Sequence, residues 1–378
     1  IISSNKGAKR VVVTNKIIAG AQETNMYLFS SYEDRRQEEL SGKQYDLEEM
    51  LGHRVHLFLF VKVRAKWDDD PDRYRDLGML GMGGMGEVRR VQDVKLRRTL
   101  AMKIIHERMM DKPRMVSRFV EEAQVEAQLQ HPNIVPVHDM GRLPDGRHYF
   151  TMRQIRGTEF GKKIKAVHQA SLEDRWKPAI DGTNFRDLIR ILQTVCETVA
   201  YAHAQGVIHR DLKPENIMLG GFGEVLVVDW GLAKVLDREE ANWETDSDEW
   251  LQTDRSSSSA HQTHMGSVSG TPCYMAPEQA KGHEVDARVD LYALGVCLYE
   301  MLEGRPPFEG GGAVEVLMAV LTREPAPLVV DPSPTVRSER LAEVVAKAMA
   351  KNPEERFSDA LAMQEALIGC FGSTFPGA

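Results

Sequence analysis

The chain has 378 residues, more than one average domain, which favours a two-lobed enzyme with additional flanking sequence. Hydrophobic residues make up 42% and charged residues 28% of the chain, and this balance excludes wholesale disorder and a membrane-embedded protein. The formal net charge of -8 is not relieved by any long block of lysine and arginine, so neither nucleic acid nor an anionic membrane is an expected partner.

The cysteines indicate the redox setting. Cys196, Cys273, Cys297 and Cys370 lie far apart and form no CxxC pair, so the sequence predicts neither a disulfide framework nor a zinc site. A reducing compartment, and hence a cytoplasmic location, is expected.

No segment of the sequence predicts a membrane span. The longest apolar stretches, such as residues 56–61, fall well short of the roughly 18 residues that a spanning helix needs. The chain begins at Ile1 without a basic region followed by an apolar core, so no signal peptide is expected. A longer parent chain that carries a membrane anchor stays compatible with the sequence.

The pattern along the chain changes near residue 74. Residues 1–73 are expected to form an N-terminal extension, to which we assign no role. From Tyr74 a glycine-rich turn at 81–86 is followed by a β-branched and basic run from Val88 to Ile105 and by a helical stretch through Gln130. This order predicts strand, turn, strand, strand and helix.

The second half of the chain predicts buried helices around a loop. Apolar residues at steps of three and four indicate a core helix over 184–205, and residues 289–302 are apolar nearly all round, which is typical of a buried helix. Residues 225–228 form a short apolar run that ends at Asp229 and predicts a strand. The stretch 237–269 is acidic and then serine-rich, and we expect it to be mobile.

Residues 81–88 fit the pattern GxGxxGxV. Absent side chains would let backbone N–H groups approach phosphate oxygens closely. An ordinary hairpin or a dinucleotide-binding turn would also fit this motif alone. The flanking sequence predicts β structure on both sides instead of a helix, which disfavours the dinucleotide turn.

Lys103 lies in an apolar strand, where an unpaired ammonium would be costly to bury. Phosphate oxygens and a glutamate of the following helix would supply the anions that it needs. Glu122 is our preferred partner because it precedes Ala123, and Glu121 is the neighbouring candidate. A solvent-facing strand lysine is the simpler alternative for any single such residue.

The most specific signal is the loop 209–216, which places Asp211, Lys213 and Asn216 at fixed offsets. The aspartate could accept the proton of a substrate hydroxyl, and the lysine could neutralise charge on a transferred phosphoryl group. The asparagine oxygen suits a hard cation such as Mg²⁺, which Asp229 could share.

Taken in order, these motifs resemble the eukaryotic-type (Hanks-type) protein kinase family. Their sequences are most similar to those of bacterial serine/threonine kinases. The resemblance covers about residues 74–370 and includes the glycine loop, Lys103, Glu122, and the segments 131–135, 209–216, 229–231, 270–272, 274–278, 290 and 352–357. A dehydrogenase or a generic nucleotide binder leaves the loop 209–216 without an explanation.

The resemblance implies an α+β, bilobal protein-kinase fold over residues 74–371. A small β-rich N-lobe with one main helix would span about 74–152, and a larger, mainly α-helical C-lobe about 157–371. The C-lobe would carry a long activation segment at 229–278.

The resemblance also implies an activity, which is transfer of the γ-phosphoryl group of ATP to serine or threonine hydroxyls of proteins with the help of Mg²⁺. Asp211 would be the base, Lys213 the γ-phosphate contact, and Asn216 and Asp229 the magnesium ligands. Nucleotide contacts are expected from a larger set, namely Leu80, Gly81, Met82, Gly83, Gly84, Met85, Gly86, Glu87, Val88, Ala101, Lys103, Glu122, Met152 and Ile155.

Other matched residues imply supporting roles. His209 and Asp290 would brace the catalytic loop, Glu278 would pair with Arg356, and Thr271 would shape the pocket beside the phosphoacceptor. A dimer that phosphorylates itself in trans is compatible with the family.

Three departures from the family pattern define alternatives. Trp230 stands where most members have phenylalanine, and Arg153 stands where an acidic hinge residue is common. The long activation segment could be ordered by a phosphate that pairs with Arg210, or it could be an insertion without a regulatory role. A non-catalytic pseudokinase and a small-molecule kinase are the competing functions, and the segment 270–278 argues against the second.

Overall fold

The computed structural model describes residues 72–171, 177–235, 272–328 and 338–370, together with three short strands near the N-terminus. Two units can be separated, one of residues 1–68 with 237–240 and one of residues 69–236 with 241–378. The predicted mobile stretch 237–269 and Thr271 lie outside the described residues.

In the first unit, three strands form an antiparallel sheet. They are β1 (Ile2–Ser4), β2 (Val11–Asn15) and β3 (Thr24–Leu28), and β2 lies in the middle. The register pairs Val12 with Ser3 on one side and with Tyr27 on the other. The pairing of these strands does not indicate a role for the N-terminal extension.

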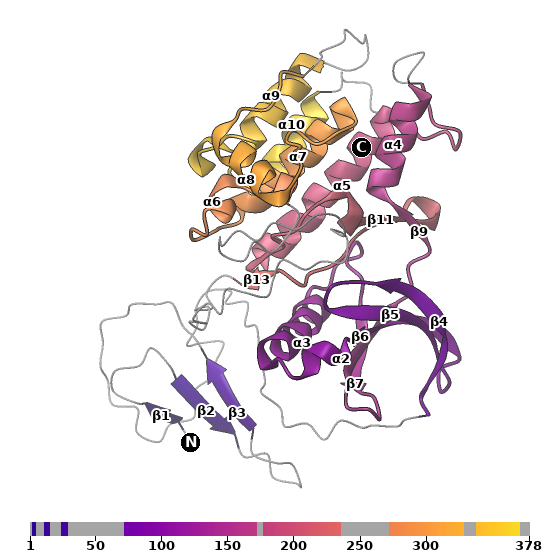
Figure 1. The fold of residues 1–378 in the computed structure, drawn as a ribbon. Helices are drawn as coiled ribbons and strands as arrows, with labels where there is room; N and C mark the ends of the chain where they lie inside the picture. The colour runs from indigo at the N-terminus through magenta and orange to yellow at the C-terminus, as the bar shows by residue number, and fades with distance from the viewer. Residues whose placement is uncertain are drawn as a thin grey trace. The chain divides into compact units, whose positions relative to one another are not determined.

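The N-lobe of the second unit is a five-stranded antiparallel sheet in the order β4-β5-β6-β8-β7 (Figure 1). Its strands are β4 (Tyr74–Met82), β5 (Gly86–Asp93), β6 (Arg98–Ile105), β7 (Val137–Arg142) and β8 (His148–Arg153). A short helix, α2 (Glu107–Met110), precedes the longer helix α3 (Pro113–Gln128), which begins with proline, a residue well suited to the first helical position. The predicted order of strand, turn, strand, strand and helix is confirmed, with α2 as an addition.

The side-chain alternation of β6 places Lys103 on the face of the sheet that α3 covers. Ile105, two residues on, packs in one cluster with Phe119 and Ala123 of α3 and with Phe150 of β8. Met102 and Ile104 belong to a separate cluster on the opposite face. Because alternate strand residues share a face, Lys103 points the same way as Ile105, toward α3.

The C-lobe is mainly helical (Figure 1). Its helices are α4 (Phe160–Ala170), α5 (Phe185–Ala204), α6 (Pro277–Ala280), α7 (Arg288–Glu303), α8 (Ala313–Thr322), α9 (Ser338–Ala348) and α10 (Ala360–Gly369). Single 3₁₀ turns span Pro214–Asn216, Gly221–Gly223, Pro272–Tyr274 and Pro353–Glu355. The short strands are β9 (Gly157–Glu159), β10 (Val207–Ile208), β11 (Ile217–Gly220), β12 (Val225–Val227) and β13 (Lys234–Val235). This two-lobed α+β architecture confirms the predicted fold class.

Two helices of the C-lobe agree with the sequence patterns and show why they form. A capping box between Asn184 and Asp187 starts α5, which buries the apolar face predicted for 184–205. Helix α7 is buried over nearly its whole length and ends at Gly304, whose φ of 76° suits a residue without a Cβ atom. None of the helices in the described ranges has the length and apolar character of a membrane span.

The expected pairing of Glu278 with Arg356 is confirmed. Arg356 donates through both terminal nitrogens to the two carboxylate oxygens of Glu278, at 2.6 and 2.8 Å. The Arg356 side chain is fully buried, and Glu278 is 12% exposed. This bidentate ion pair links α6 to the turn that precedes α10.

Arg356→Met is expected to lower the free energy of unfolding by about 3–5 kcal/mol, because it leaves the mostly buried carboxylate of Glu278 without its cation. Arg305→Met is the matched control, since Arg305 pairs with the exposed Glu309, and we expect it to cost no more than about 1 kcal/mol. Urea unfolding of both variants measures the difference. Equal losses in the two variants would contradict a structural role for the Glu278–Arg356 pair.

Candidate active site

The first half of the site is an ion pair between β6 and α3. The Nζ atom of Lys103 lies 2.5 Å from Oε1 of Glu122 and 4.0 Å from Oδ1 of Asp229. Burial alone would lower the pKa of Lys103, but the charges of Glu122 and Asp229 outweigh it and hold the pKa above its usual range. The ammonium therefore stays charged. The structure thus brings together three residues that are far apart in sequence, and it selects Glu122 over Glu121 as the partner of Lys103.

The glycine-rich turn joins β4 to β5. The N–H of Gly83 donates to the carbonyl of Gly86 at 2.8 Å, and a ring nitrogen of His106 lies 2.9 Å from the carbonyl of Gly83. A Cβ atom at Gly86 would come within 2.3 Å of the carbonyl oxygen of Ile104, so only glycine fits there. A Cβ atom at Gly81 or Gly84 would have no other atom within 4 Å, so that side of the turn is accessible to a ligand.

Sheet register decides which residues of the turn face Lys103. Val88 lies directly opposite Lys103 in the β5–β6 ladder, and Gly81 lies opposite Val88. Because paired residues share a face, these two lie on the side of Lys103, as does Ala101 two residues before it.

Several other residues of the turn that are predicted to contact the nucleotide have side chains that do not lie beside Lys103. The carboxylate of Glu87 pairs with Arg89 and Arg147, and Met85 packs against the cluster of Ile105 and Phe150. Leu80 and Met82 are exposed, Met82 at 65%.

The strand that leads out of the N-lobe carries Met152 and then Arg153. Met152 packs at the edge of the same cluster and lies opposite Ala101 in the β6–β8 ladder, while Ile155 follows in the partly buried connection to the C-lobe. Arg153 pairs with Glu224 of the C-lobe, with Nη1 and Oε1 2.5 Å apart. The guanidinium of Arg153 is therefore engaged in a contact between the lobes.

The second half of the site is the loop that follows β10. Lys213 Nζ donates to Oδ2 of Asp211 at 2.6 Å. Asn216 Nδ2 donates to the backbone carbonyl of Asp211 at 2.8 Å and to its Oδ2 at 3.2 Å. The three residues singled out in the sequence form one hydrogen-bonded group.

Buried Asp290 of α7 braces this loop, as expected. Its carboxylate accepts from the backbone N–H groups of His209 and Arg210, both at 2.9 Å, and from the ring of His203 at 2.7 Å. Burial alone would raise the pKa of Asp290, but the His203 contact and the other hydrogen bonds hold it below its usual range. Arg210 has a φ of 68°, a left-handed conformation that is strained outside glycine and that these bonds hold in place.

Asp229 also has a left-handed φ, of 66°. Partial burial would raise its pKa, but the charges of Lys103, His209 and Lys213 lower it, so the carboxylate is ionised. Oxygen donors are what Mg²⁺ prefers, and Nδ2 of Asn216 is already bonded to Asp211, which leaves its side-chain oxygen for a cation. The residues present therefore fit a magnesium site.

Glu126 was not singled out by the sequence patterns as part of the site, whereas Trp230 was named only as a departure from the family pattern. Glu126 lies one turn after Glu122 on α3 and is 4% exposed, and burial together with the nearby Glu122 charge raises its pKa to about 8. Trp230 is 1% exposed and packs against the ring of His209, with centroids 4.6 Å apart. The four-residue spacing from Glu122 was the only signal for Glu126, because it puts both carboxyls on one helix face.

The comparisons with known proteins agree with this geometry. The family model described as protein kinase domain matches residues 74–368. The chain belongs to the protein kinase family. Within this family, it is 36% identical over 299 residues to serine/threonine-protein kinase PknD of Chlamydia trachomatis, an alignment that covers 78% of this chain and 31% of that kinase.

Two further kinases are similar to a comparable degree. PknD of Protochlamydia amoebophila is 38% identical over 244 residues, which cover 64% of this chain and 24% of the relative. Serine/threonine-protein kinase pkn3 of Myxococcus xanthus is 35% identical over 305 residues, which cover 78% of this chain and 49% of the relative. The chain thus spans about a third or less of the PknD kinases and about half of pkn3.

The raised pKa of Glu126 predicts a pH dependence of stability. The unfolded-state pKa of a glutamate is about 4.3, below the folded value of about 8. The folded state therefore holds the extra proton, and the free energy of unfolding is expected to fall as the pH rises through this window. Relative to Glu126→Gln, the wild type should lose up to about 1.4 kcal/mol per pH unit between about pH 5 and pH 7. Urea unfolding at several pH values measures the slope, and parallel curves for the two proteins would contradict it.

Proposed function

We propose that this chain is a serine/threonine protein kinase that transfers the γ-phosphoryl group of ATP to hydroxyl groups of protein substrates. The observation that carries the proposal is the approach of Asp229 to the Lys103–Glu122 pair. The loop that holds Asp211, Lys213 and Asn216 directly precedes the strands leading to Asp229, and the N–H of Val228 donates to the carbonyl of Asn216 at 2.9 Å. The two halves of the site are therefore linked by short contacts.

The nucleotide would lie between the glycine turn and the hinge. Lys103 would bind the α- and β-phosphates, and Glu122 would hold the ammonium in place. Backbone N–H groups of the turn 81–86 would contact phosphate oxygens, while Val88, Ala101, Met152 and Ile155 would line the adenine site. For Leu80, Met82, Met85 and Glu87, whose side chains are exposed or engaged elsewhere, we propose contacts through the backbone alone.

The chemistry would take place at the catalytic loop. The oxygen of a serine or threonine hydroxyl attacks the γ-phosphorus, the bond from that phosphorus to the bridging β-oxygen breaks, and ADP leaves. Asp211 accepts the hydroxyl proton, and Lys213 neutralises negative charge on the transferred group. Asn216 and Asp229 would hold Mg²⁺, which neutralises the phosphate oxygens when bound.

The proposal extends to the setting of the domain. The names of the relatives support protein substrates with serine or threonine acceptors. Four cysteines that form no disulfide among the described residues, together with the acidic net charge, support a cytoplasmic domain without nucleic-acid partners. Trans-autophosphorylation between two copies is part of the same proposal.

A non-catalytic scaffold is the competing function, and Trp230 is its sequence support. The indole is buried, and the Asp229 side chain beside it remains 52% exposed and close to Lys103. The substitution is thus accommodated without removing the metal-binding carboxylate, which favours the catalytic proposal.

Asp211→Asn tests the proposed base. It is expected to lower kcat for transfer of labelled phosphate from Mg²⁺-ATP to a generic protein acceptor by about 10²–10⁴-fold, because the amide cannot accept the hydroxyl proton. Asp181→Asn is the matched control, since its carboxylate lies at the surface beside Lys163, and it should keep the wild-type rate. Equal labelling by Asp211→Asn and wild type would refute the assigned base.

The activation segment gives a second test, although residues 245–271 lie outside the described part of the chain. We propose that autophosphorylation within Thr245 to Thr271 raises activity through a phosphate that pairs with Arg210. Dephosphorylated enzyme is expected to be about tenfold less active, a factor that one charge-assisted hydrogen bond can supply. Mass mapping after incubation with ATP locates the phosphate. Full activity after replacement of all hydroxyls in the segment would count against the proposal.

A further inference from the structure

The backbone carbonyl of Arg210 accepts a hydrogen bond from a side chain outside the loop 209–216. Nε2 of Gln279, in α6, donates to this carbonyl oxygen at 2.8 Å. The two residues are 69 positions apart in sequence, and none of the sequence patterns singled out Gln279. Because the bond joins two distant segments, it forms only when α6 is docked beside the loop.

Gln279 belongs to a firmly anchored turn of helix. The preceding residue, Glu278, forms the bidentate ion pair with the fully buried Arg356. Arg356 also donates to the backbone carbonyls of Arg288 and Ala350, both at 2.9 Å. These bonds of one buried arginine hold α6 in place, so the amide of Gln279 is already positioned when it meets its acceptor.

The acceptor belongs to a strained residue. The φ of Arg210 is 68°, in the left-handed region that residues other than glycine seldom adopt. The N–H of Arg210 donates to buried Asp290 at 2.9 Å, and its carbonyl accepts from Gln279. Arg210 is therefore held at both of its backbone groups, by α7 at the N–H and by α6 at the carbonyl.

The carbonyl of Arg210 and the N–H of Asp211 form one planar peptide unit. A rotation of this plane changes the direction of the Asp211 side chain, whose Oδ2 accepts from Lys213 at 2.6 Å. The N–H of Asp211 donates to Nδ1 of His209 at 3.3 Å, which is long for a hydrogen bond. The bond from Gln279 to the carbonyl is shorter, at 2.8 Å, and is therefore the stronger restraint on the plane.

We propose that Gln279 is a positioning residue that sets the direction of the Asp211 carboxylate through the peptide unit that it holds. The bond offsets part of the cost of the left-handed conformation of Arg210. Without it, Arg210 relaxes toward the common regions of φ and ψ, and the Asp211 carboxylate turns away. Because α6 lies at the end of the activation segment proposed at 229–278, the alignment of Asp211 then depends on the docking of that segment. This role rests on the proposed kinase function, whereas the contact itself does not.

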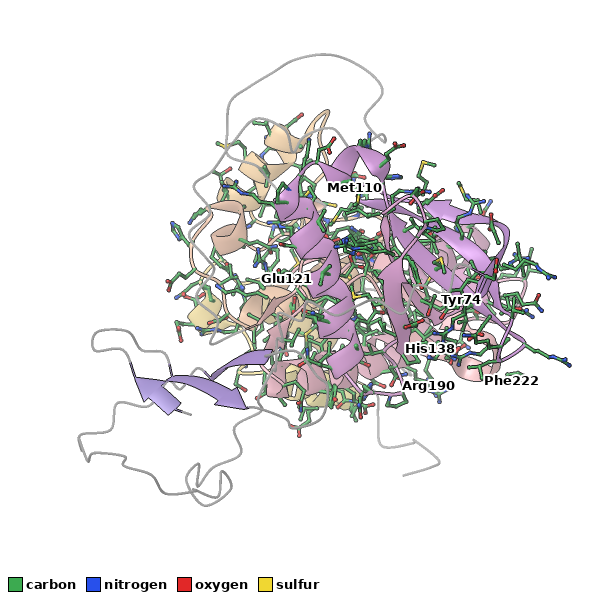
Figure 2. All side chains as sticks on the ribbon, turned by 90° about the horizontal axis from the view of Figure 1, so that it is seen from below. Tyr74, Met110, Glu121, His138, Arg190 and Phe222 are labelled. Atoms are coloured by element: carbon green, nitrogen blue, oxygen red, sulfur yellow. The ribbon has the colours of Figure 1, made fainter. Side chains whose placement is uncertain are left out.

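The N-lobe takes no part in this contact. Gln279 and Arg210 both belong to the C-lobe, whereas the Lys103–Glu122 pair involves α3, the helix that carries Glu121 in Figure 2. Loss of the bond therefore leaves the proposed phosphate contact of Lys103 in place. The expected defect lies in the transfer step and not in ATP binding.

Kinetics of Gln279 variants separate the donor from the volume of the side chain. Gln279→Leu removes the donor and is expected to lower kcat about tenfold, with little change in KM for ATP. Gln279→Glu keeps the shape but places a carboxylate oxygen against the carbonyl, so it should lose at least as much. Gln279→Lys supplies a donor again and should stay within about threefold of wild type. Gln364→Leu is the matched control, since Gln364 of α10 donates to the carbonyl of Gln193 in α5, and it should keep the wild-type kcat.

A double variant tests whether Gln279 acts through Asp211. When Asp211→Asn has already removed the proposed base, adding Gln279→Leu should cost less than about twofold in kcat, because residues that act together are not additive. A side chain that only stabilises the fold would lower the active fraction of the enzyme by the same factor in both backgrounds. A further loss of about tenfold in the double variant would therefore overturn the positioning role. Equal kcat values for Gln279→Leu and wild type would overturn it as well.

Carbonyl NMR tests the contact without any phosphoryl transfer. Labelling of arginine with ¹³C at the carbonyl and of aspartate with ¹⁵N restricts the amide–carbonyl correlations to the Arg-Asp steps of the sequence, which are 75–76, 186–187 and 210–211. The 210–211 correlation is identified by its loss in Asp211→Asn. We expect its carbonyl frequency to move in Gln279→Leu and to stay near the wild-type position in Gln279→Lys, while the other two correlations stay unchanged.

The two experiments distinguish failure of the positioning role from failure of the kinase function. An unchanged 210–211 correlation in Gln279→Leu would overturn the role, whatever the kinetics. A shifted correlation in a chain that transfers no phosphate would support the contact and refute the kinase function, and the positioning role with it. A shifted correlation together with the expected loss of kcat supports both.

Discussion

The architecture of the site depends on the burial of the Lys103 ammonium. Its side chain is 17% exposed and that of Glu122 is 2% exposed, so both charges have lost most of their hydration. Such a pair adds little net stability, but loss of either partner would leave an uncompensated charge in the protein interior. The ion pair therefore fixes the position of α3 more than it stabilises the fold. The stabilisation comes instead from apolar contacts on the same face, such as the tilted stack of Phe119 on Phe150 with centroids 5.2 Å apart.

The C-lobe half of the site is held in a different way. Its anchor is α7, a helix buried on all sides, whose Asp290 accepts hydrogen bonds from the backbone of the loop 209–216. Those bonds keep Arg210 in a left-handed conformation that is otherwise unfavourable by about 1–3 kcal/mol. One half of the site thus depends on a helix docked by an ion pair, and the other on backbone bonds to the centre of the lobe.

The sequence predicted the fold, and it singled out residues that the structure brings together, because both follow from local patterns. The periodicity of 184–205 and the apolar run of 289–302 identify α5 and α7, and the fixed offsets of Asp211, Lys213 and Asn216 are short enough to specify one loop. What the sequence could not provide is the direction of individual side chains. Glu87 adjoins the glycine turn in sequence, yet the pleat directs it to Arg89 and Arg147 on the other face. Arg153 finds Glu224 only because the two lobes approach each other there, and no local pattern encodes that distance.

The connection after α3 determines how that helix can move. Nδ2 of Asn133 donates to the carbonyl of Val225 at 2.7 Å, and the carbonyl of Asn133 accepts from Val227, so the chain just beyond the helix is joined to β12 of the C-lobe. The beginning of α3, in contrast, packs within the N-lobe. A displacement of the helix therefore amounts to a rotation about its C-terminal end, and residues move farther the nearer they lie to Pro113. Glu122 lies farther from this pivot than Glu126, so a small rotation that barely shifts Glu126 can separate Glu122 from Lys103. The Lys103–Glu122 ion pair restrains the helix away from this pivot, where a given rotation moves residues farther.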